Sequence, residues 1–268
     1  GFLLDFKYKR KFELIKLRAY IKLVDKKLSF ITLLIYIANK LIPKILHFLP
    51  LKIIKDKDDY IFNANESSLK VNKKNSFLNS KLYDGYFQNF KIVNEVLPEL
   101  MNLVKPYLDS GKEREFSSLY KLISSKENSV ALGIRFYEES SNPKAHALNG
   151  SQKKVSDFNK IIKKFEIDLD SPHFFIFVQE ENDFTNQLKF RSEYNFITHK
   201  KGYNGSWERL KAQSLCKHHI FNNSSFYWWG CIFSKNRFLK NKNNKPQKIY
   251  VSDNFIFQEI YNPDWIKF

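Results

Sequence analysis

The stretch CKHHIFNNSSFYWWGCIFS, residues 216–234, decides how the rest of the chain is interpreted. A short apolar segment, residues 219–221, runs into the polar residues 222–225 (NNSS) and then into an aromatic run that ends at Gly230. This pattern is typical of a buried parallel strand that stops at a polar loop and continues as a helix. Asn and Ser are good N-cap residues, and a helix start that faces a crevice suits a phosphate. The stretch therefore predicts either a well-capped helix alone or an anion site.

Strand and helix patterns alternate from about residue 128 onward. Strands are expected at residues 129–135, 173–178, 196–198, 219–221 and 248–253, with helices near residues 155–165, 206–215 and 225–230. Repeated strand–helix units predict a parallel sheet, in which ligands bind at the carboxyl ends of the strands. We therefore expect an α/β fold in which residues 127–268 form a Rossmann-like domain and residues 1–126 belong to a partner domain.

The first half gives weaker signals. Residues 28–39 (LSFITLLIYIAN) carry no charge, but the run is shorter than the roughly twenty residues that span a bilayer. It is expected to be a core or interface helix, or a basic amphipathic segment that rests on anionic lipid. Apolar residues recur at helical spacing from Val93 to Val104, which predicts an amphipathic helix despite Pro98. Pro106 and the Asp-Ser-Gly cluster at residues 109–111 are expected to end it.

Composition bounds the class of protein. Of the 268 residues, 43% are hydrophobic, so the chain can form packed cores. The 45 Lys and Arg exceed the 28 Asp and Glu, and the formal net charge of +17 favours anionic partners, unless it reflects drift in composition. Two cysteines form no disulfide framework, which fits a reducing cytoplasm. The chain opens with Gly1 and shows no signal peptide, so we expect a fragment or a processed chain.

Arg135 closes the first expected strand of the second half. A guanidinium at the carboxyl end of a central strand can hold a diphosphate with two parallel charge-assisted bonds, although a surface ion pair is the alternative. His199 follows another expected strand and is either a contact to the same ligand or a solvated turn residue. A metal cluster of Cys216, His199, His218 and His219 is disfavoured, because adjacent residues on a strand point to opposite faces.

Read whole, CKHHIFNNSSFYWWG resembles the CKHNIIANSSFSWWGAWL block of the bacterial α-1,2-fucosyltransferases, glycosyltransferase family 11. The departures are His219, Asn222 and Tyr227. Looser similarity extends over residues 83–268 and includes YDGYFQNFKIV, HFFIFVQEENDF, THKKGYNGSWERLKAQSLCKH and the closing NPDWIKF. The glycine-rich opening of the family, GGLGNQ, is absent, so the resemblance implies an N-terminally truncated member.

The same resemblance suggests roles for individual residues. Where the family has HxRRxD, with an arginine that binds the diphosphate of GDP-fucose, this chain has GIRFYE at residues 133–138. Arg135 keeps the first arginine, Gly133 and Phe136 replace the histidine and the second arginine, and Glu138 stands where aspartate would be. The expected roles are catalytic for Arg135 and Glu138, with Glu139 as another candidate base. The expected donor-binding residues are Arg135, His199, Asn223, Ser224 and Ser225.

The resemblance implies the GT-B fold, with two Rossmann-like domains of which the N-terminal, acceptor-side one is incomplete. The implied reaction is inverting transfer of L-fucose from GDP-β-L-fucose to a sugar hydroxyl of an oligosaccharide or glycolipid acceptor, in an α-1,2 linkage. It would serve the synthesis of surface polysaccharide such as O-antigen, without a metal or other cofactor, in the cytoplasm or at the cytoplasmic face of the membrane. The rival interpretations are a basic protein that binds nucleic acid or anionic membranes, and a degenerate transferase without activity.

Overall fold

The computed structural model describes part of the chain in two compact units, Gly1–Phe87 and Gln88–Phe268. The described residues are 52–55, 81–84, 89–109, 114–136, 153–239, 246–255 and 258–268. In the first unit, strands β1 (Lys52–Lys55) and β2 (Lys81–Asp84) pair in parallel. The uncharged run at residues 28–39 lies outside the described residues. Of the helices that are described, none is long and apolar enough to cross a bilayer.

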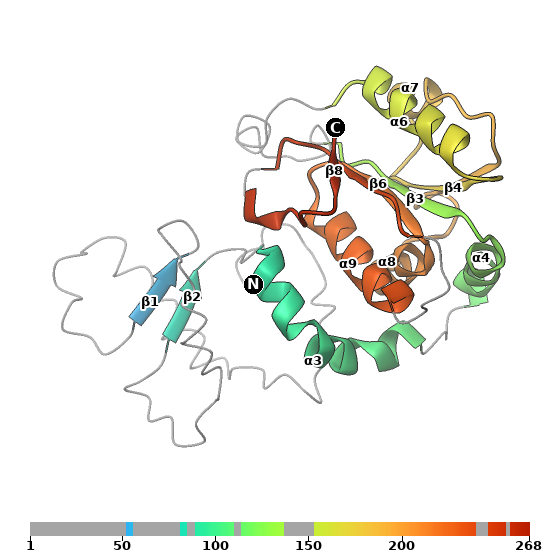
Figure 1. Cartoon of the computed structure of the whole chain (residues 1–268). Coiled ribbons are helices and arrows are strands. Elements are labelled where there is room, and N and C mark those ends of the chain that lie inside the picture. The colour runs from blue at the N-terminus through green and yellow to red at the C-terminus, as the bar shows by residue number, and fades with distance from the viewer. Residues whose placement is uncertain are drawn as a thin grey trace. The chain divides into compact units, whose positions relative to one another are not determined.

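The second unit is built on one six-stranded sheet (Figure 1). Its strands are β3 (Ser129–Gly133), β4 (His173–Phe177), β5 (Tyr194–Ile197), β6 (His218–Phe221), β7 (Ile249–Val251) and β8 (Ile266–Lys267). All neighbours pair in parallel, in the order β5-β4-β3-β6-β7-β8. This confirms the expected α/β class with a parallel sheet. The order matches the doubly wound Rossmann sheet, which starts at its centre, winds outward and then reverses, here between β3 and β6.

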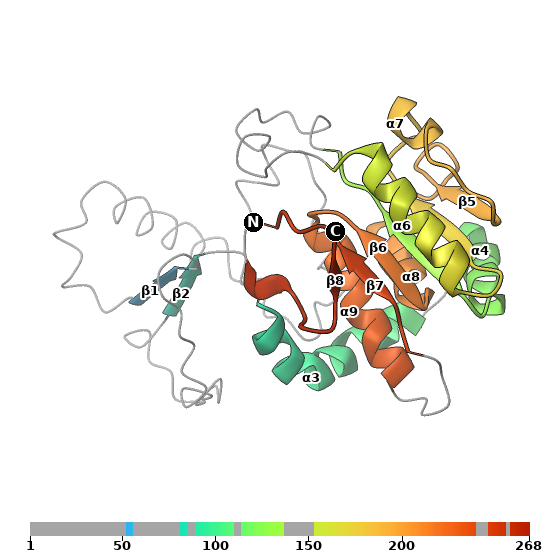
Figure 2. The same cartoon turned by 45° about the horizontal axis from the view of Figure 1, so that its top comes forward.

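Helices cover both faces of the sheet (Figures 1 and 2). The helices are α3 (Phe90–Asp109), α4 (Arg114–Ser125), α6 (Val155–Asp168), α7 (Asp183–Asn186), α8 (Ser206–Leu215) and α9 (Ser225–Leu239), with a short 3-10 turn η5 (Gln258–Ile260). Side chains of each central strand alternate between two cores, so Leu132 packs with α6 while Ala131 packs with α8 and α9. The four inner strands, β4, β3, β6 and β7, are buried on both faces, which explains their largely apolar sequences.

Helix α3 has the expected amphipathic character and passes through both of its prolines. Val93, Leu97, Val104 and Leu108 are buried, and the helix continues through Pro98 and Pro106 to Asp109. Pro106 therefore does not end the helix, which ends at Asp109 in the cluster at residues 109–111, as the sequence indicated. Both prolines are exposed, and so are the residues four positions earlier whose carbonyl groups lose their helical donor. Water can reach those carbonyls, which makes the prolines tolerable on this side of the helix.

Helices α3 and α4 pack with the sheet. The Phe90 and Trp265 rings meet edge to face with centroids 5.8 Å apart, and the Tyr120 hydroxyl donates to the Glu208 carbonyl at 3.2 Å. Consequently the compact unit that holds the sheet begins at Gln88, earlier than the boundary near residue 126 that the sequence pattern indicated. The apolar faces of these two helices need the sheet to cover them.

Candidate functional site

The carboxyl ends of β3 and β6 meet where the winding direction of the sheet reverses. Gly133 and Phe221 are partners in the last pair of this ladder, and the Asn222 N–H donates to the Gly133 carbonyl at 3.3 Å. Beyond this point the two strands diverge, because β3 is followed by α6 and β6 by α9. Open α/β sheets bind their ligands in the crevice that forms at such a reversal. The candidate site is therefore this junction of β3, β6 and α9.

Asn222 ties Arg135 to the turn between β6 and α9. Its side-chain Oδ1 accepts from the Arg135 backbone N–H at 2.7 Å, and its Nδ2 donates to the Arg135 carbonyl at 2.8 Å. Asn222 is 2% exposed, whereas Arg135 is half-buried. Both polar ends of one amide are thus used on the backbone of one residue. The structure places Arg135 next to the NNSS segment, as the pattern of strand ends predicted.

The NNSS segment forms the entry into α9. The Asn223 Nδ2 donates to the Asn254 carbonyl at 3.2 Å, which links this turn to the chain that leaves β7. The Ser224 carbonyl accepts the helical bond from Trp228 N–H at 3.0 Å, and Ser225 is exposed as the first residue of the helix. The first N–H groups of a helix have no partner within it and carry a partial positive charge. Asn223, Ser224 and Ser225 therefore lie where an anion at the junction would meet those groups.

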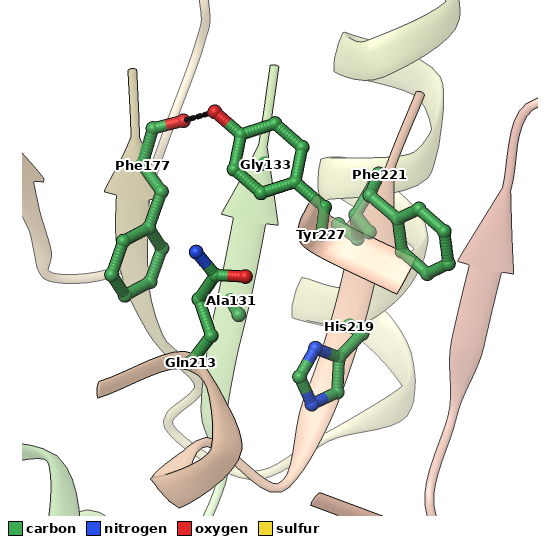
Figure 3. A pocket seen from close by; sticks show the side chains of 8 residues that line it. Ala131, Gly133, Phe177, Gln213, His219, Phe221 and Tyr227 are labelled. Atoms are coloured by element: carbon green, nitrogen blue, oxygen red, sulfur yellow. Dashed lines mark hydrogen bonds between the residues drawn. The ribbon is translucent and has the colours of Figure 1, made fainter. Parts of the chain in front are cut away.

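Tyr227, on the first turn of α9, reaches back over the end of β3 (Figure 3). Its hydroxyl donates to the Phe177 carbonyl at 2.7 Å and lies 3.2 Å from the Ile134 carbonyl. Its ring lies over Gly133, where an added Cβ would come within 2.5 to 2.7 Å of three ring atoms. Gln213 and His219 line the same small space on this face of the sheet. The buried face of the sheet below the junction is thus closed by Tyr227.

Phe136 belongs to the core and not to the site. It is buried, and its ring packs edge to face against Phe184 with centroids 5.3 Å apart. Position 136 of the GIRFYE segment is therefore a core position, and Arg135 is the arginine of this segment. Glu138 and Glu139 lie outside the described residues.

His199 lies at the carboxyl end of the edge strand β5, with β4 between it and β3. Parallel strands are spaced about 5 Å apart, so His199 is about 10 Å along the sheet from the Arg135 corner. Its side chain is exposed, and its backbone N–H donates to the Gln179 carbonyl at 3.0 Å. Partial burial, and then the nearby positive charge of Arg209, lower the pKa of His199 below 6.5. His199 is a neutral residue at the rim of the same edge of the sheet.

Arg209 is a residue that the sequence analysis missed. It is 5% exposed, and its guanidinium donates to the carbonyls of Ile197 at 3.0 Å, Val178 at 3.0 Å and Tyr203 at 3.2 Å. One buried cation thus joins the carboxyl ends of β4 and β5 to the turn before α8. Its spacing in the sequence could have indicated its burial. Arg209 lies three residues before Ala212 and four before Gln213, so all three share the buried face of the helix.

His218 and His219 lie on opposite faces of β6, as strand geometry predicted. The His218 ring meets the Phe165 ring and its Nδ1 accepts from the Lys248 N–H at 2.9 Å, whereas His219 Nε2 lies 3.2 Å from the Cys216 carbonyl. Burial, above all, lowers the pKa of each from 6.5 to about 3. Both are therefore neutral core residues at physiological pH. Within the described part of the chain, no group of three or more His, Cys, Asp or Glu could hold a metal ion.

The tryptophans of the aromatic run belong to the core. Trp228 is fully buried, and its indole N–H donates to the Ile260 carbonyl at 2.9 Å. Trp229 packs partly buried against Trp228 and Phe233. Both indoles therefore pack α9 against its neighbours.

Comparisons with protein-family models, with curated proteins and with solved structures find no match to this chain. The chemistry of the junction itself is therefore the starting point for a functional proposal.

Proposed function

We propose that the junction of β3, β6 and α9 binds the diphosphate of a nucleotide sugar, and that the chain is a glycosyltransferase. The observation that carries the proposal is that Asn222, in the turn before α9, bonds the backbone of Arg135 at the reversal point of a doubly wound parallel sheet. A guanidinium and the first N–H groups of a helix are two kinds of donor that suit phosphate oxygens. The resemblance of this segment to the α-1,2-fucosyltransferases makes GDP-β-L-fucose the proposed donor.

The proposed reaction is the displacement of GDP by a sugar hydroxyl, with inversion at the anomeric carbon to an α-1,2 linkage. Negative charge grows on the diphosphate as the glycosidic bond breaks, and fixed donors lower the barrier by stabilising that charge. Arg135 and the entry into α9 take this role in our proposal, with no metal required. Glu138 is the proposed general base for the acceptor hydroxyl, and His199 a peripheral donor contact.

The proposed architecture is of the GT-B kind, in which the unit before Gln88 contributes an acceptor-side domain. The parallel pairing of β1 and β2 is consistent with a second parallel sheet. The acceptor would be an oligosaccharide or glycolipid of a surface polysaccharide, and the cytoplasm is the proposed location. The net charge of +17 would favour contact with the anionic inner face of the membrane.

A second candidate is a transferase that has lost its activity, and one contact set favours it. Phe136 is packed against Phe184 where a second arginine would serve the site, and Tyr227 closes the space over Gly133. The junction therefore has one guanidinium where the family has two, and the space over Gly133 is filled by a ring. Such a protein would bind GDP without transferring the sugar.

The test combines calorimetry and transfer assays on the full chain, with GDP, GDP-fucose and GDP-mannose. Arg135→Ala and Ser225→Ala are compared with Arg191→Ala, which removes an exposed arginine before the amino end of β5. We expect preference for GDP-fucose, and Arg135→Ala to lower turnover by about a hundredfold or more, because a charge-stabilising group is lost. Binding of GDP without turnover would favour the inactive candidate. Equal turnover of both donors, or an Arg135→Ala variant as active as Arg191→Ala, would contradict the proposal.

A further inference from the structure

Two side chains from the β6–α9 segment hold the backbone of β3 just beyond its last paired residue. The Tyr227 hydroxyl lies within 3.2 Å of the Ile134 carbonyl, and the Asn222 amide bonds both the N–H and the carbonyl of Arg135. Side chains thus continue the ladder by two residues where strand pairing has ended. The position of Arg135 is thereby set by the same segment that begins α9.

This arrangement requires glycine at position 133. The Tyr227 ring lies where the Cβ of any other residue would be, at 2.5 to 2.7 Å, and real Cβ atoms do not approach ring carbons so closely. The ring cannot withdraw without breaking the 2.7 Å bond from its hydroxyl to the Phe177 carbonyl. Gly133 and Tyr227 are therefore coupled, and each constrains the residue at the other position.

We propose that Gly133, Asn222 and Tyr227 are positioning residues, which fix Arg135 against the start of α9 so that guanidinium and helix N–H groups engage one diphosphate. This inference rests on the proposed function for its ligand, but the hold on Arg135 is a property of the fold. The Asn222 amide and the Tyr227 hydroxyl bond backbone groups at this corner, so in this proposal they act through the position of Arg135 and not on the ligand.

The first test is Asn222→Ala in the full chain, with Asn159→Ala as a matched control. The Asn159 amide also bonds backbone groups in both directions, to the Gln187 carbonyl at 3.1 Å and from the Lys189 N–H at 2.8 Å, but it lies on α6. Calorimetry with GDP and GMP measures whether the diphosphate contact is affected. We expect Asn222→Ala to weaken GDP binding about tenfold and GMP binding less than about twofold, and the control to change neither.

Hydrogen exchange of the Arg135 amide separates this inference from the proposed function, because it needs no nucleotide. Asn222→Ala removes the acceptor of that amide, so its exchange is expected to become about tenfold faster or more, while Asn159→Ala leaves it unchanged. If the wild type binds no GDP but Asn222→Ala still speeds exchange of the Arg135 amide, the nucleotide-sugar proposal is refuted and the positioning role of Asn222 stands. Unchanged exchange at Arg135, or equal losses of GDP and GMP affinity, would overturn the positioning role of Asn222.

A double-mutant cycle tests the coupling of Gly133 to Tyr227. We expect Gly133→Ala to raise the equilibrium constant for unfolding by about tenfold or more, and by less than about twofold when Tyr227→Ala has removed the ring. Tyr227→Phe keeps the ring and loses the hydroxyl, so it should lower the ratio of GDP to GMP affinity. Tyr120→Phe, which removes a hydroxyl bonded to the Glu208 carbonyl, should not. Equal effects of Gly133→Ala in both backgrounds would refute the coupling.

Discussion

The two buried histidines of β6 make the stability of the sheet depend on pH. Each has a pKa lowered from 6.5 to about 3 in the folded chain, chiefly because burial penalises the charged imidazolium. The unfolded chain therefore takes up protons first as the pH falls. The stabilisation is complete above about pH 6.5 and is lost progressively as the pH falls from there toward 3.

The magnitude follows from the size of the shift. One pH unit within that window removes about 1.4 kcal/mol per histidine, so lowering the pH from 7 to 5 removes about 2 kcal/mol for each. The pair together loses about 4 kcal/mol. Domains are stable by about 5–15 kcal/mol in total, so this loss is a large share of the free energy of unfolding.

The assay is urea unfolding at pH 7, 6 and 5, followed by the fluorescence of the four tryptophans, of which Trp228 is fully buried. His218→Asn keeps an acceptor for the Lys248 N–H, and His219→Gln keeps a donor for the Cys216 carbonyl. Each variant should remove about half of the pH dependence, and the double variant most of it. His199→Gln, which changes an exposed histidine, should have a smaller effect than either.

Equal free energies of unfolding at pH 7 and pH 5 in the wild type would refute the argument. The same conclusion would follow if the double variant kept the full pH dependence, because the titrating groups would then lie elsewhere.

Two further predictions concern the packing of α8. Arg209→Met leaves the buried carbonyls of Val178 and Ile197 without their charged donor, so we expect a loss of about 3 kcal/mol in urea unfolding. A loss below about 1 kcal/mol would show that water replaces the guanidinium there. Gly230→Ala places a Cβ against the amide oxygen of Gln213 and within 2.8 Å of its Cβ, so we expect thermal unfolding to reveal a loss of about 1–3 kcal/mol. Gln213→Ala removes the amide but keeps the Cβ, so it should restore part of that loss. An unchanged melting temperature would mean that α8 and α9 can move apart at little cost.

Much of the sheet could be predicted, because central parallel strands have continuous apolar sequences that are easy to recognise. Runs such as HFFIFV are apolar throughout, since both of their faces are buried, and they matched β4 closely. Helix α8 occupies the residues 206–215 that its pattern indicated. The location of Arg135 beside the NNSS turn also followed, because parallel strands end at one edge. Strand β8 was missed, because two exposed residues carry no periodic signal.

The contacts that shape the junction were beyond sequence reasoning. Asn222 and Arg135 are separated by 87 positions in the sequence. In sequence, Gly133, Asn222 and Tyr227 were three unrelated departures from the fucosyltransferase blocks. In the structure they meet at the end of β3, where the Tyr227 ring occupies the space that a side chain at position 133 would fill. Pattern analysis treats each position separately and cannot reveal that one change accommodates another.

The central place of β3 has a consequence for how the protein is made. Val130 pairs with Phe174 on one side and with His218 on the other, and both partners are synthesised after it. Translation adds about 5–20 residues per second, so a wholly apolar strand waits for several seconds with both edges open. An unpaired apolar strand is a template for aggregation. The nascent chain is therefore most vulnerable between the emergence of β3 and that of β6, and a chaperone that shields this segment would raise the yield of folded protein.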